Sequence, residues 1–427
     1  MENLLISGGT RLHGKVRIHG AKNAALPILA ATLLAGGPVT LREIPELEDV
    51  RTMLDLLKHL GVKVKRLAPC RYRLDPVGFA GWDAPYELVR KMRASFLVLG
   101  PILSLHGRTR VSLPGGCAIG SRPIDLHLKG LQALGAEISM GYGFIEAKSK
   151  QLRGNHIFLD YPSVGATENL LMAASLARGE TVIVGCAQEP EVVDLANFLN
   201  ILGAKISGAG TDRITVKGVQ ALGGGVEYTI IPDRIEAGTY LAAAAAAGGN
   251  LQLTNVEPEH LRPTLAKLVE AGATIQETDR GLFVERDGPL NSFDITTLPY
   301  PGFPTDLQPI FTALASLSQG VSLIRETVFE NRFRYVDELL RMGASIKVEG
   351  NVALVYGVST LYGTRVKAHD LRGGAALVVA ALAAQGTTTL TCLHHLDRGY
   401  ADLELNLQRV GAKIQRVPAE DTGIVTA

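Results

Sequence analysis

The sequence has few cysteines, few aromatic residues and almost no net charge. Its 427 residues include only four cysteines, Cys70, Cys117, Cys186 and Cys392, and no pair of them has C-x-x-C spacing. This pattern argues against a zinc ribbon and against the disulfide framework of a secreted domain. The 43 basic and 42 acidic side chains leave a formal net charge of +1, so no global field recruits nucleic acid. We therefore expect no nucleic-acid partner, and any anion site must be built locally.

Long hydrophobic runs and a leader pattern are also missing. The most apolar stretches, "YLAAAAAAGG" and "GGAALVVAALAAQG", are shorter than the roughly 20 residues that a membrane-spanning helix needs. The start, "MENLLISGGT", has no basic region followed by an apolar core. No Gly-x-x-x-x-Gly-Lys-Ser/Thr loop occurs, so a P-loop nucleoside triphosphatase is not indicated. These absences predict a cytoplasmic protein without a membrane partner.

Glycine is abundant, and it marks an internal repeat. A short pattern of the type "LGAKIS" returns six times at intervals of 68 to 74 residues. About 24 residues before it runs an Ala/Leu-rich segment that ends in glycine and a Thr/Val run, as in "LMAASLARGETVIV". The six repeat glycines are Gly61, Gly135, Gly203, Gly272, Gly343 and Gly411.

Each unit is expected to contain two helices and several strands. In "VDLANFLNILG", Leu195, Phe198, Leu199 and Leu202 share one face of a helix, and Gly203 falls where a left-handed residue ends it. The Ala-rich segment predicts a second helix that is buried on several sides. Units of about 70 residues are too long for known solenoids and predict six small α/β layers, three in each of two domains. We place the boundary at residue 230, giving domains of 22–230 and of 1–21 with 231–427.

Polar residues that differ between the units are the candidates for chemistry. Arg122, Arg332 and Arg398 lie 13, 11 and 13 residues before their repeat glycines, in equivalent loops before a helix. Helix N-termini carry unpaired N–H groups, and arginine suits bidentate contacts with phosphate or carboxylate. This recurrence predicts a cleft for a multiply anionic ligand, against the simpler reading of solvated surface charges. Further candidates precede the other helix of each unit: Lys22, Asn23, Arg93, Ser163, Asp306, Asp370 and Arg372.

The segment "PGGCAIGSRPID" places Cys117 between glycines and five residues before Arg122. Such a loop suits a lid that brings a reactive group to a substrate, with the arginine close to a thiolate or an anion. The residues alone leave open an exposed cysteine without a chemical role. Cys186 and Cys392 follow strand-like runs and are expected to be buried.

Nine motifs, in order along nearly the whole chain, resemble those of the UDP-N-acetylglucosamine enolpyruvyl transferases of the EPSP synthase family. They are "GAKNAALPILAA", "PGGCAIGSRPID", "SVGATEN", "LGGG", "PDRIEAGTY", "FPTDLQP", "ETVFENRF", "DLRGG" and "HLDRGY". The resemblance implies an inside-out α/β barrel fold, with two domains of three βαβαββ-type units. It also implies that the N-terminal strand returns to the C-terminal half and that the active site lies between the domains.

The same resemblance implies transfer of the enolpyruvyl group of phosphoenolpyruvate to the 3′-hydroxyl of UDP-N-acetylglucosamine, with release of phosphate, as the first committed step of peptidoglycan synthesis. Cys117 would donate a proton to the methylene carbon, and Asp306 would orient or deprotonate the sugar hydroxyl. No metal, organic cofactor or obligate protein partner is implied. Phosphoenolpyruvate would meet Lys22, Asn23, Arg122 and Arg398. The UDP-sugar would meet Arg93, Arg122, Pro123, Ile124, Asp125, Leu126, Ser163, Val164, Asp306 and Val328, and domain closure would use Arg332, Asp370 and Arg372.

The chain departs from some family members at Tyr161, Glu46 and Glu48, where these carry lysines. The departures bear on contacts with the diphosphate and at the rim of the site. Three alternatives are kept: the sister enzyme acting on shikimate 3-phosphate, a non-catalytic paralogue that binds a nucleotide sugar, and a thiol hydrolase. The cysteine loop argues against the first, the intact Lys22 and Arg398 against the second, and the lack of a histidine partner motif against the third.

Overall fold

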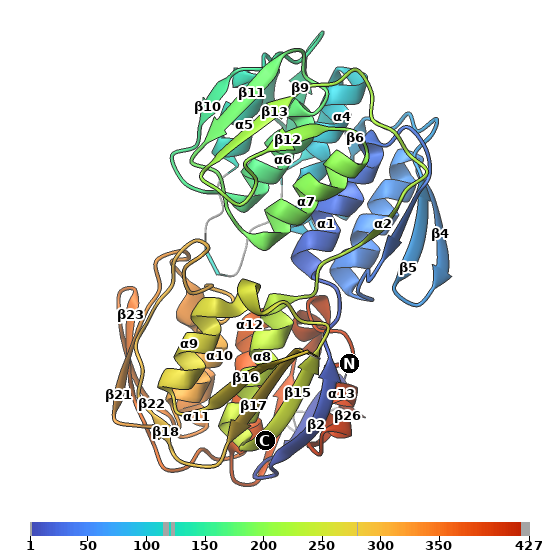
Figure 1. The fold of residues 1–427 in the computed structure, drawn as a ribbon. Helices are drawn as coiled ribbons and strands as arrows, with labels where there is room; N and C mark the ends of the chain where they lie inside the picture. Colours follow the sequence, from blue (N-terminus) through green and yellow to red (C-terminus); the bar gives the residue numbers. More distant parts are fainter. Residues whose placement is uncertain (1, 114–118, 121–123, 280, 420–427) are drawn as a thin grey trace, which may run out of the picture.

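The computed structural model describes residues 2–113, 119–120, 124–279 and 281–419, and it divides into two halves (Figure 1). Two clusters of buried hydrophobic residues form the cores. One draws its members from residues 21–230, and the other from residues 4–18 and 235–414. Within the described chain, no helix has the length and apolarity needed to span a membrane.

The repeat unit is a βαβαββ module, and residues 83–148 illustrate it. The first strand pairs in parallel with the second, and the last two strands add on antiparallel to it. In chain order its elements are β6 (Asp83–Ala84), α4 (Leu99–His106), β7 (Arg108–Ser112), α5 (Asp125–Ala133), β8 (Glu137–Gly141) and β9 (Phe144–Lys148).

Over the described residues there are six four-stranded sheets with this same strand order, which confirms the expected mixed α/β fold. The first half contains two more of these sheets. One has the strand order β14 (Glu227–Thr229), β3 (Val39–Arg42), β5 (Arg71–Asp75) and β4 (Lys63–Ala68). The other has the order β10 (His156–Phe158), β11 (Glu180–Val184), β13 (Arg213–Lys217) and β12 (Lys205–Ser207). The second half has β16 (Thr274–Thr278), β17 (Gly281–Arg286), β15 (Gly249–Thr254) and β2 (Leu12–Arg17); β19 (Ile295–Thr296), β21 (Val321–Arg325), β23 (Val352–Tyr356) and β22 (Ser345–Glu349); and β24 (Arg365–Lys367), β25 (Thr387–Thr391), β1 (Glu2–Ser7) and β26 (Lys413–Pro418). The short strands β18 (Leu290–Asn291) and β20 (Ser318–Gln319) pair separately.

The N-terminal strands complete sheets of the second half, as expected. Strand β1 pairs antiparallel with β25 and β26, and β2 pairs in parallel with β15. In Figure 1 the blue strand β2 accordingly lies beside the yellow-green strand β15. The first half is closed in a similar way by its last strand, because β14 pairs with β3 near its beginning.

The six repeat glycines end the amphipathic helices in the conformation that the sequence predicts. Their φ angles lie between 92° and 105°, which an L side chain rarely adopts. Each glycine turns the chain from a helix into the next strand. The helices concerned are α2 (Glu48–Leu60), α5, α7 (Pro190–Ile201), α9 (Arg262–Glu270), α11 (Val336–Arg341) and α13 (Leu403–Arg409).

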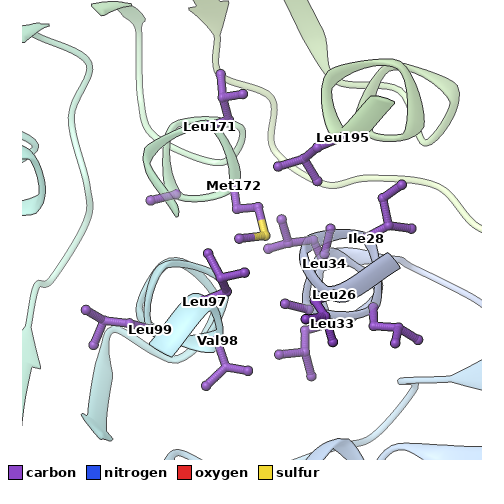
Figure 2. Packing of buried hydrophobic residues seen from close by; sticks show 14 of the residues in the cluster. Leu26, Ile28, Leu33, Leu34, Leu97, Val98, Leu99, Leu171, Met172 and Leu195 are labelled. Carbon is purple, nitrogen blue, oxygen red and sulfur yellow. The ribbon is translucent and has the colours of Figure 1, made fainter. Parts of the chain in front are cut away.

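The Ala-rich helices form the centre of each half, and the sheets cover them. Figure 2 shows Leu26, Leu97, Met172 and Leu195, from four helical segments, pointing toward one another. Small side chains let these helices approach closely, which explains why nearly every residue of α8 is buried. The central helices are α1 (Lys22–Ala31), η2 (Arg93–Val98) with α4, and α6 (Val164–Ala174) in the first half, and α8 (Arg234–Ala247), α10 (Gln308–Ala315) and α12 (Leu371–Ala383) in the second.

Candidate active site

A cleft of about 1110 Å³ is lined by residues of both halves. Three predicted site residues, Cys117, Arg122 and Pro123, lie outside the described residues. The structure places the others together in this cleft: Lys22, Asn23, Arg93, Ile124, Asp125, Leu126, Ser163, Val164, Asp306, Val328, Arg332, Asp370, Arg372 and Arg398.

The N-terminal ends of the central helices meet at this cleft. Lys22 begins α1 and Arg93 begins η2, while the Ser163 side chain caps α6 by accepting from the Ala166 N–H at 3.4 Å. In the second half, the Asp370 side chain caps α12 through the N–H groups of Arg372 and Gly373, at 3.0 Å each. Helix N-termini carry partial positive charge, so their convergence favours an anionic ligand.

Asp49 joins two predicted cations across the two halves. Its carboxylate accepts from Lys22 Nζ at 3.3 Å and from Arg398 Nε at 2.9 Å. Burial lowers the pKa of Lys22, and the attraction of Asp49 offsets this only in part. Lys22 and Asp49 both come from the first half, whereas Arg398 belongs to the second. Asp49 was not among the predicted residues, although a charged residue on the buried face of the amphipathic helix α2 was a readable signal.

Asp306 lies between two buried arginines. Its Oδ1 accepts from the Arg332 guanidinium at 2.8 Å, and its Oδ2 accepts from Arg372 Nε at 3.2 Å. Arg332 is only 1% exposed and also donates to the Thr305 carbonyl, so its position is fixed from two sides. Burial disfavours charge on Arg372, but Tyr400 and Asp306 raise its pKa overall. The two arginines together hold the Asp306 carboxylate in one orientation at the cleft.

Glu326 positions the segment that carries Val328. This buried carboxylate accepts from the backbone N–H groups of Val328 at 2.8 Å and Phe329 at 3.1 Å. It also accepts from the hydroxyls of Thr297 and Thr305. The sequence motif contained Glu326, but its role as an acceptor for the loop depends on contacts that only the fold creates.

Three acidic residues that line the cleft, Glu168, Glu189 and Glu191, were not among the predicted residues either. Glu191 pairs with Arg234 of α8 at 3.1 Å, and Glu189 accepts from the Tyr300 N–H at 3.3 Å, so both contacts cross between the halves. Glu168 of α6 is 3% exposed, and its Oε1 has no hydrogen-bond partner within the described chain. Burial raises the pKa of Glu168 well above its ordinary value, and Glu191 and Glu189 add to the rise.

Replacing Glu168 by glutamine is expected to remove a pH-dependent loss of stability. Above its ordinary pKa of 4.5 the unfolded chain releases this proton, whereas the folded protein keeps it, so stability falls as pH rises. The advantage of the glutamine variant over the wild type should grow by up to about 1.4 kcal/mol per pH unit. Urea unfolding between pH 4.5 and 7.5 measures it, with the exposed Glu180→Gln as control. Parallel curves for wild type and Glu168→Gln would contradict this assignment.

The three positions that depart from the family pattern lie in different surroundings. Tyr161 lines the cleft, and burial raises the pKa of its hydroxyl. Glu46 instead pairs with Arg66 at 2.8 Å and accepts from the Cys70 N–H at 3.2 Å. Glu48 is exposed in the first turn of α2 and does not line the cleft. Of the three, only Tyr161 is placed to meet a ligand.

Two of the described cysteines, Cys186 and Cys392, differ in burial. Cys186 is buried as predicted, but Cys392 is only partly buried because it occupies a left-handed turn after β25 rather than the strand. Within the ranges that the structure describes, no three His, Cys, Asp or Glu side chains are arranged to hold a metal ion.

Comparisons with known proteins agree with the motifs and the fold. The family model of EPSP synthase (3-phosphoshikimate 1-carboxyvinyltransferase) matches residues 6–407. UDP-N-acetylglucosamine 1-carboxyvinyltransferase 2 of Carboxydothermus hydrogenoformans is 57% identical over 98% of this chain and 100% of its own length. UDP-N-acetylglucosamine 1-carboxyvinyltransferase of Gloeobacter violaceus is 53% identical, covering 97% of this chain and 90% of its own.

Solved structures support the same fold. The enolpyruvyl transferase NikO from Streptomyces tendae superposes with a TM-score of 0.88 at 28% identity, over 97% of this chain and 99% of its own. EPSP synthase from Acinetobacter baumannii gives a TM-score of 0.76 at 20% identity, over 98% of this chain and 100% of its own, which supports the fold alone. The chain belongs to the EPSP synthase family, in the group of the UDP-N-acetylglucosamine 1-carboxyvinyltransferases.

Proposed function

We propose that this enzyme transfers the enolpyruvyl group of phosphoenolpyruvate to the 3′-hydroxyl of UDP-N-acetylglucosamine and releases phosphate. The observation that carries the proposal is a cleft lined from both halves by those predicted substrate residues that the structure describes. The names of relatives that are 50–57% identical over nearly the full chain support the choice of sugar substrate. The reaction is assigned to peptidoglycan synthesis in the cytoplasm.

Phosphoenolpyruvate is assigned to the Lys22 end of the cleft. Lys22, Asn23 and Arg398 line it there, and Asp49 fixes the two cations relative to each other. Together with Arg122 these groups would bind the carboxylate and the phosphate, because several fixed cations stabilise a multiply anionic substrate and its departing phosphate better than mobile ones do.

The transfer requires an acid that protonates the methylene carbon of phosphoenolpyruvate and a sugar hydroxyl that is oriented toward C2. Cys117 is assigned as the acid, and its proton goes to the methylene carbon of phosphoenolpyruvate. The sugar hydroxyl oxygen bonds to C2, and its proton passes to Asp306, whose carboxylate is held by Arg332 and Arg372. The tetrahedral intermediate then loses phosphate from C2 and a proton from the new methyl group, which restores the double bond. A positioned acid or base typically contributes about 10²- to 10⁴-fold.

The UDP-sugar is assigned to the rest of the cleft, between the start of α5 and the start of α6. Ile124, Asp125 and Leu126 would face the nucleotide, and Ser163 and Val164 the diphosphate. Arg93 and Val328 line the same space.

Residues 22–230 and residues 1–21 with 231–427 are proposed to act as the two domains that close on the substrates. The two separate hydrophobic cores support this division. Three residues of the second half line the cleft: Arg332, Asp370 and Arg372. When the domains close, they would contact the substrate or residues of the first half.

Phosphate release tests the proposed function directly. The protein is mixed with phosphoenolpyruvate and either UDP-N-acetylglucosamine or shikimate 3-phosphate. We expect phosphate only with the UDP-sugar, together with a product heavier by the enolpyruvyl group. Release with shikimate 3-phosphate instead would assign the sister activity. Tight UDP-sugar binding without any turnover would identify a non-catalytic paralogue.

Alkylation by an epoxide analogue of phosphoenolpyruvate is expected to label Cys117 alone. A thiolate is the reactive form, and burial raises the pKa of Cys70 and raises that of Cys186 to about 11, so both stay protonated at neutral pH. Peptide mass mapping after partial labelling locates the adduct. Labelling of Cys70 at a similar rate would show that Cys117 is not the activated thiol.

A further inference from the structure

The sheet formed by β19, β21, β23 and β22 differs from the other five four-stranded sheets on its outward side. On its two central strands, β21 and β23, every second side chain is buried against the helices, and the alternate side chains point outward. Only one of these outward side chains is charged, Arg325. The other five are aliphatic or aromatic, and we call them the apolar face: Val321, Leu323, Val352, Leu354 and Tyr356.

The corresponding positions of the other repeat units are mostly polar or charged. On their outward side, β7 and β9 present Arg108, Arg110 and Glu146, and β15 presents Asn250 and Gln252. The six units share one strand order, so the folding of a unit does not require hydrophobic residues at these positions. The apolar face is therefore a departure from the repeat, and departures of this kind also marked the residues of the cleft.

The described part of the chain leaves the apolar face partly exposed. Val321 is 49% exposed, and Tyr356 is 42% exposed. Among the described residues, none of the five side chains belongs to the buried core of the second half, packs against that core or lines the cleft. Strands β21, β22 and β23 lie at the outer surface of the second half (Figure 1). Hydrophobic side chains that gather at a surface in this way are typical of a protein–protein contact.

The strand register places opposite charges on the two sides of the apolar face. Arg325 of β21 lies opposite Val352 of β23, and Val352 lies opposite Glu349 of β22. These three residues form one row across the sheet, with the guanidinium at one end and the carboxylate at the other. The Glu349 side chain is exposed, and it pairs with Lys347 of the same strand at 2.6 Å. The face is therefore hydrophobic in the middle, basic on one side and acidic on the other.

Two copies of this chain can satisfy both the hydrophobic and the charged groups of this surface. A twofold axis that runs along β23 exchanges the positions of β21 and β22, because these strands flank β23. Each Arg325 then lies opposite Glu349 of the other copy, and this contact occurs twice. Leu354 and Tyr356 lie on the axis and meet the same side chains of the other copy. Sheets that pack face to face keep nearly aligned strands about 10 Å apart, which this arrangement satisfies.

We propose that the apolar face is the contact surface of a weak, reversible homodimer of this chain. The outward side of the sheet offers nine side chains, three from each of β21, β23 and β22, whereas a standard stable interface has roughly 20–30 residues per partner. We therefore expect a dissociation constant in the micromolar range. None of the apolar face lines the cleft, so each copy keeps its own cleft, and the inference does not depend on the proposed function.

Sedimentation velocity over a wide range of protein concentration tests the contact. We expect monomers at nanomolar concentration and a shift toward dimers at high micromolar concentration. Leu354→Glu should raise the dissociation constant by about tenfold or more, because two glutamates would then face each other on the axis. Phe283→Glu is the matched control, since it makes the same kind of change on the outward side of β17 in another unit, and it should leave self-association unchanged.

A charge reversal tests the twofold arrangement itself, with thermal unfolding to show that each variant is folded. Arg325→Glu should weaken the dimer, because the new carboxylate would face Glu349 of the other copy, and adding Glu349→Arg should restore most of the loss. Wild-type protein that stays monomeric at every concentration would overturn the proposal. Unchanged association of Leu354→Glu, or no recovery in the double variant, would do the same. Assemblies larger than the dimer would also contradict it, since a twofold contact of this kind closes on itself.

Discussion

Replacement of Asp306 by asparagine is expected to lower kcat by about 10²- to 10⁴-fold, the range for loss of a positioned base. The carboxylate is placed to accept the proton of the sugar hydroxyl, and asparagine keeps its size without its basicity. Arg332 and Arg372 donate to different oxygens of Asp306, and asparagine keeps only one of these oxygens, so one of the two hydrogen bonds is lost and the orientation of the side chain is weakened as well. Single-turnover phosphate release at saturating substrate measures the chemical step.

Loss of the carboxylate also leaves two buried guanidinium groups without their counter-charge. We expect Asp306→Asn to lower the free energy of unfolding by about 1–3 kcal/mol, the usual cost of unpaired polar groups. Asp306→Glu is the matched control, because it keeps the charge between the arginines while displacing it by one methylene. The glutamate variant should recover stability and remain impaired in kcat. If both variants turned over at the wild-type rate, Asp306 would have no part in the proton transfer.

The repeat explains why so much of the fold could be predicted from the sequence. Each of the six glycines must adopt a left-handed conformation at the end of a helix, and this local requirement is independent of the rest of the fold. Polar residues that break the repeat pattern then mark helix starts. Lys22, Arg93 and Ser163 were found in this way, and all lie at the cleft.

The residues that were missed act through partners distant in sequence. Asp49 matters because Arg398, 349 residues away, donates to it. Glu168 reads as an ordinary polar position in a helix, and its burial follows only when α6 packs against its neighbours, α7 among them. Pairings of this kind are decided by tertiary contacts and leave no periodic trace in the sequence.

A second large effect is expected at Lys22. Replacement by glutamine should lower kcat/KM for phosphoenolpyruvate by about 10²- to 10⁴-fold, as expected for the loss of one or two charge-assisted hydrogen bonds to an anionic substrate. The same change should leave the protein at least as stable as the wild type. Burial lowers the pKa of Lys22 from 10.5, so its charge is disfavoured in the folded state and costs stability below that pKa.

Asp49→Asn is the matched control for this variant, because it neutralises the other partner of the same ion pair. It leaves Lys22 and Arg398 as adjacent cations without the carboxylate that joins them, so we expect lower stability together with a raised KM for phosphoenolpyruvate. Urea unfolding and steady-state kinetics on both variants check the pair. The two variants are expected to change the free energy of unfolding in opposite directions, because Lys22→Gln removes a buried charge, whereas Asp49→Asn removes the partner of that charge. If Lys22→Gln destabilised the protein as much as Asp49→Asn, the ammonium would be a structural ion pair rather than a charge held at a stability cost for the substrate.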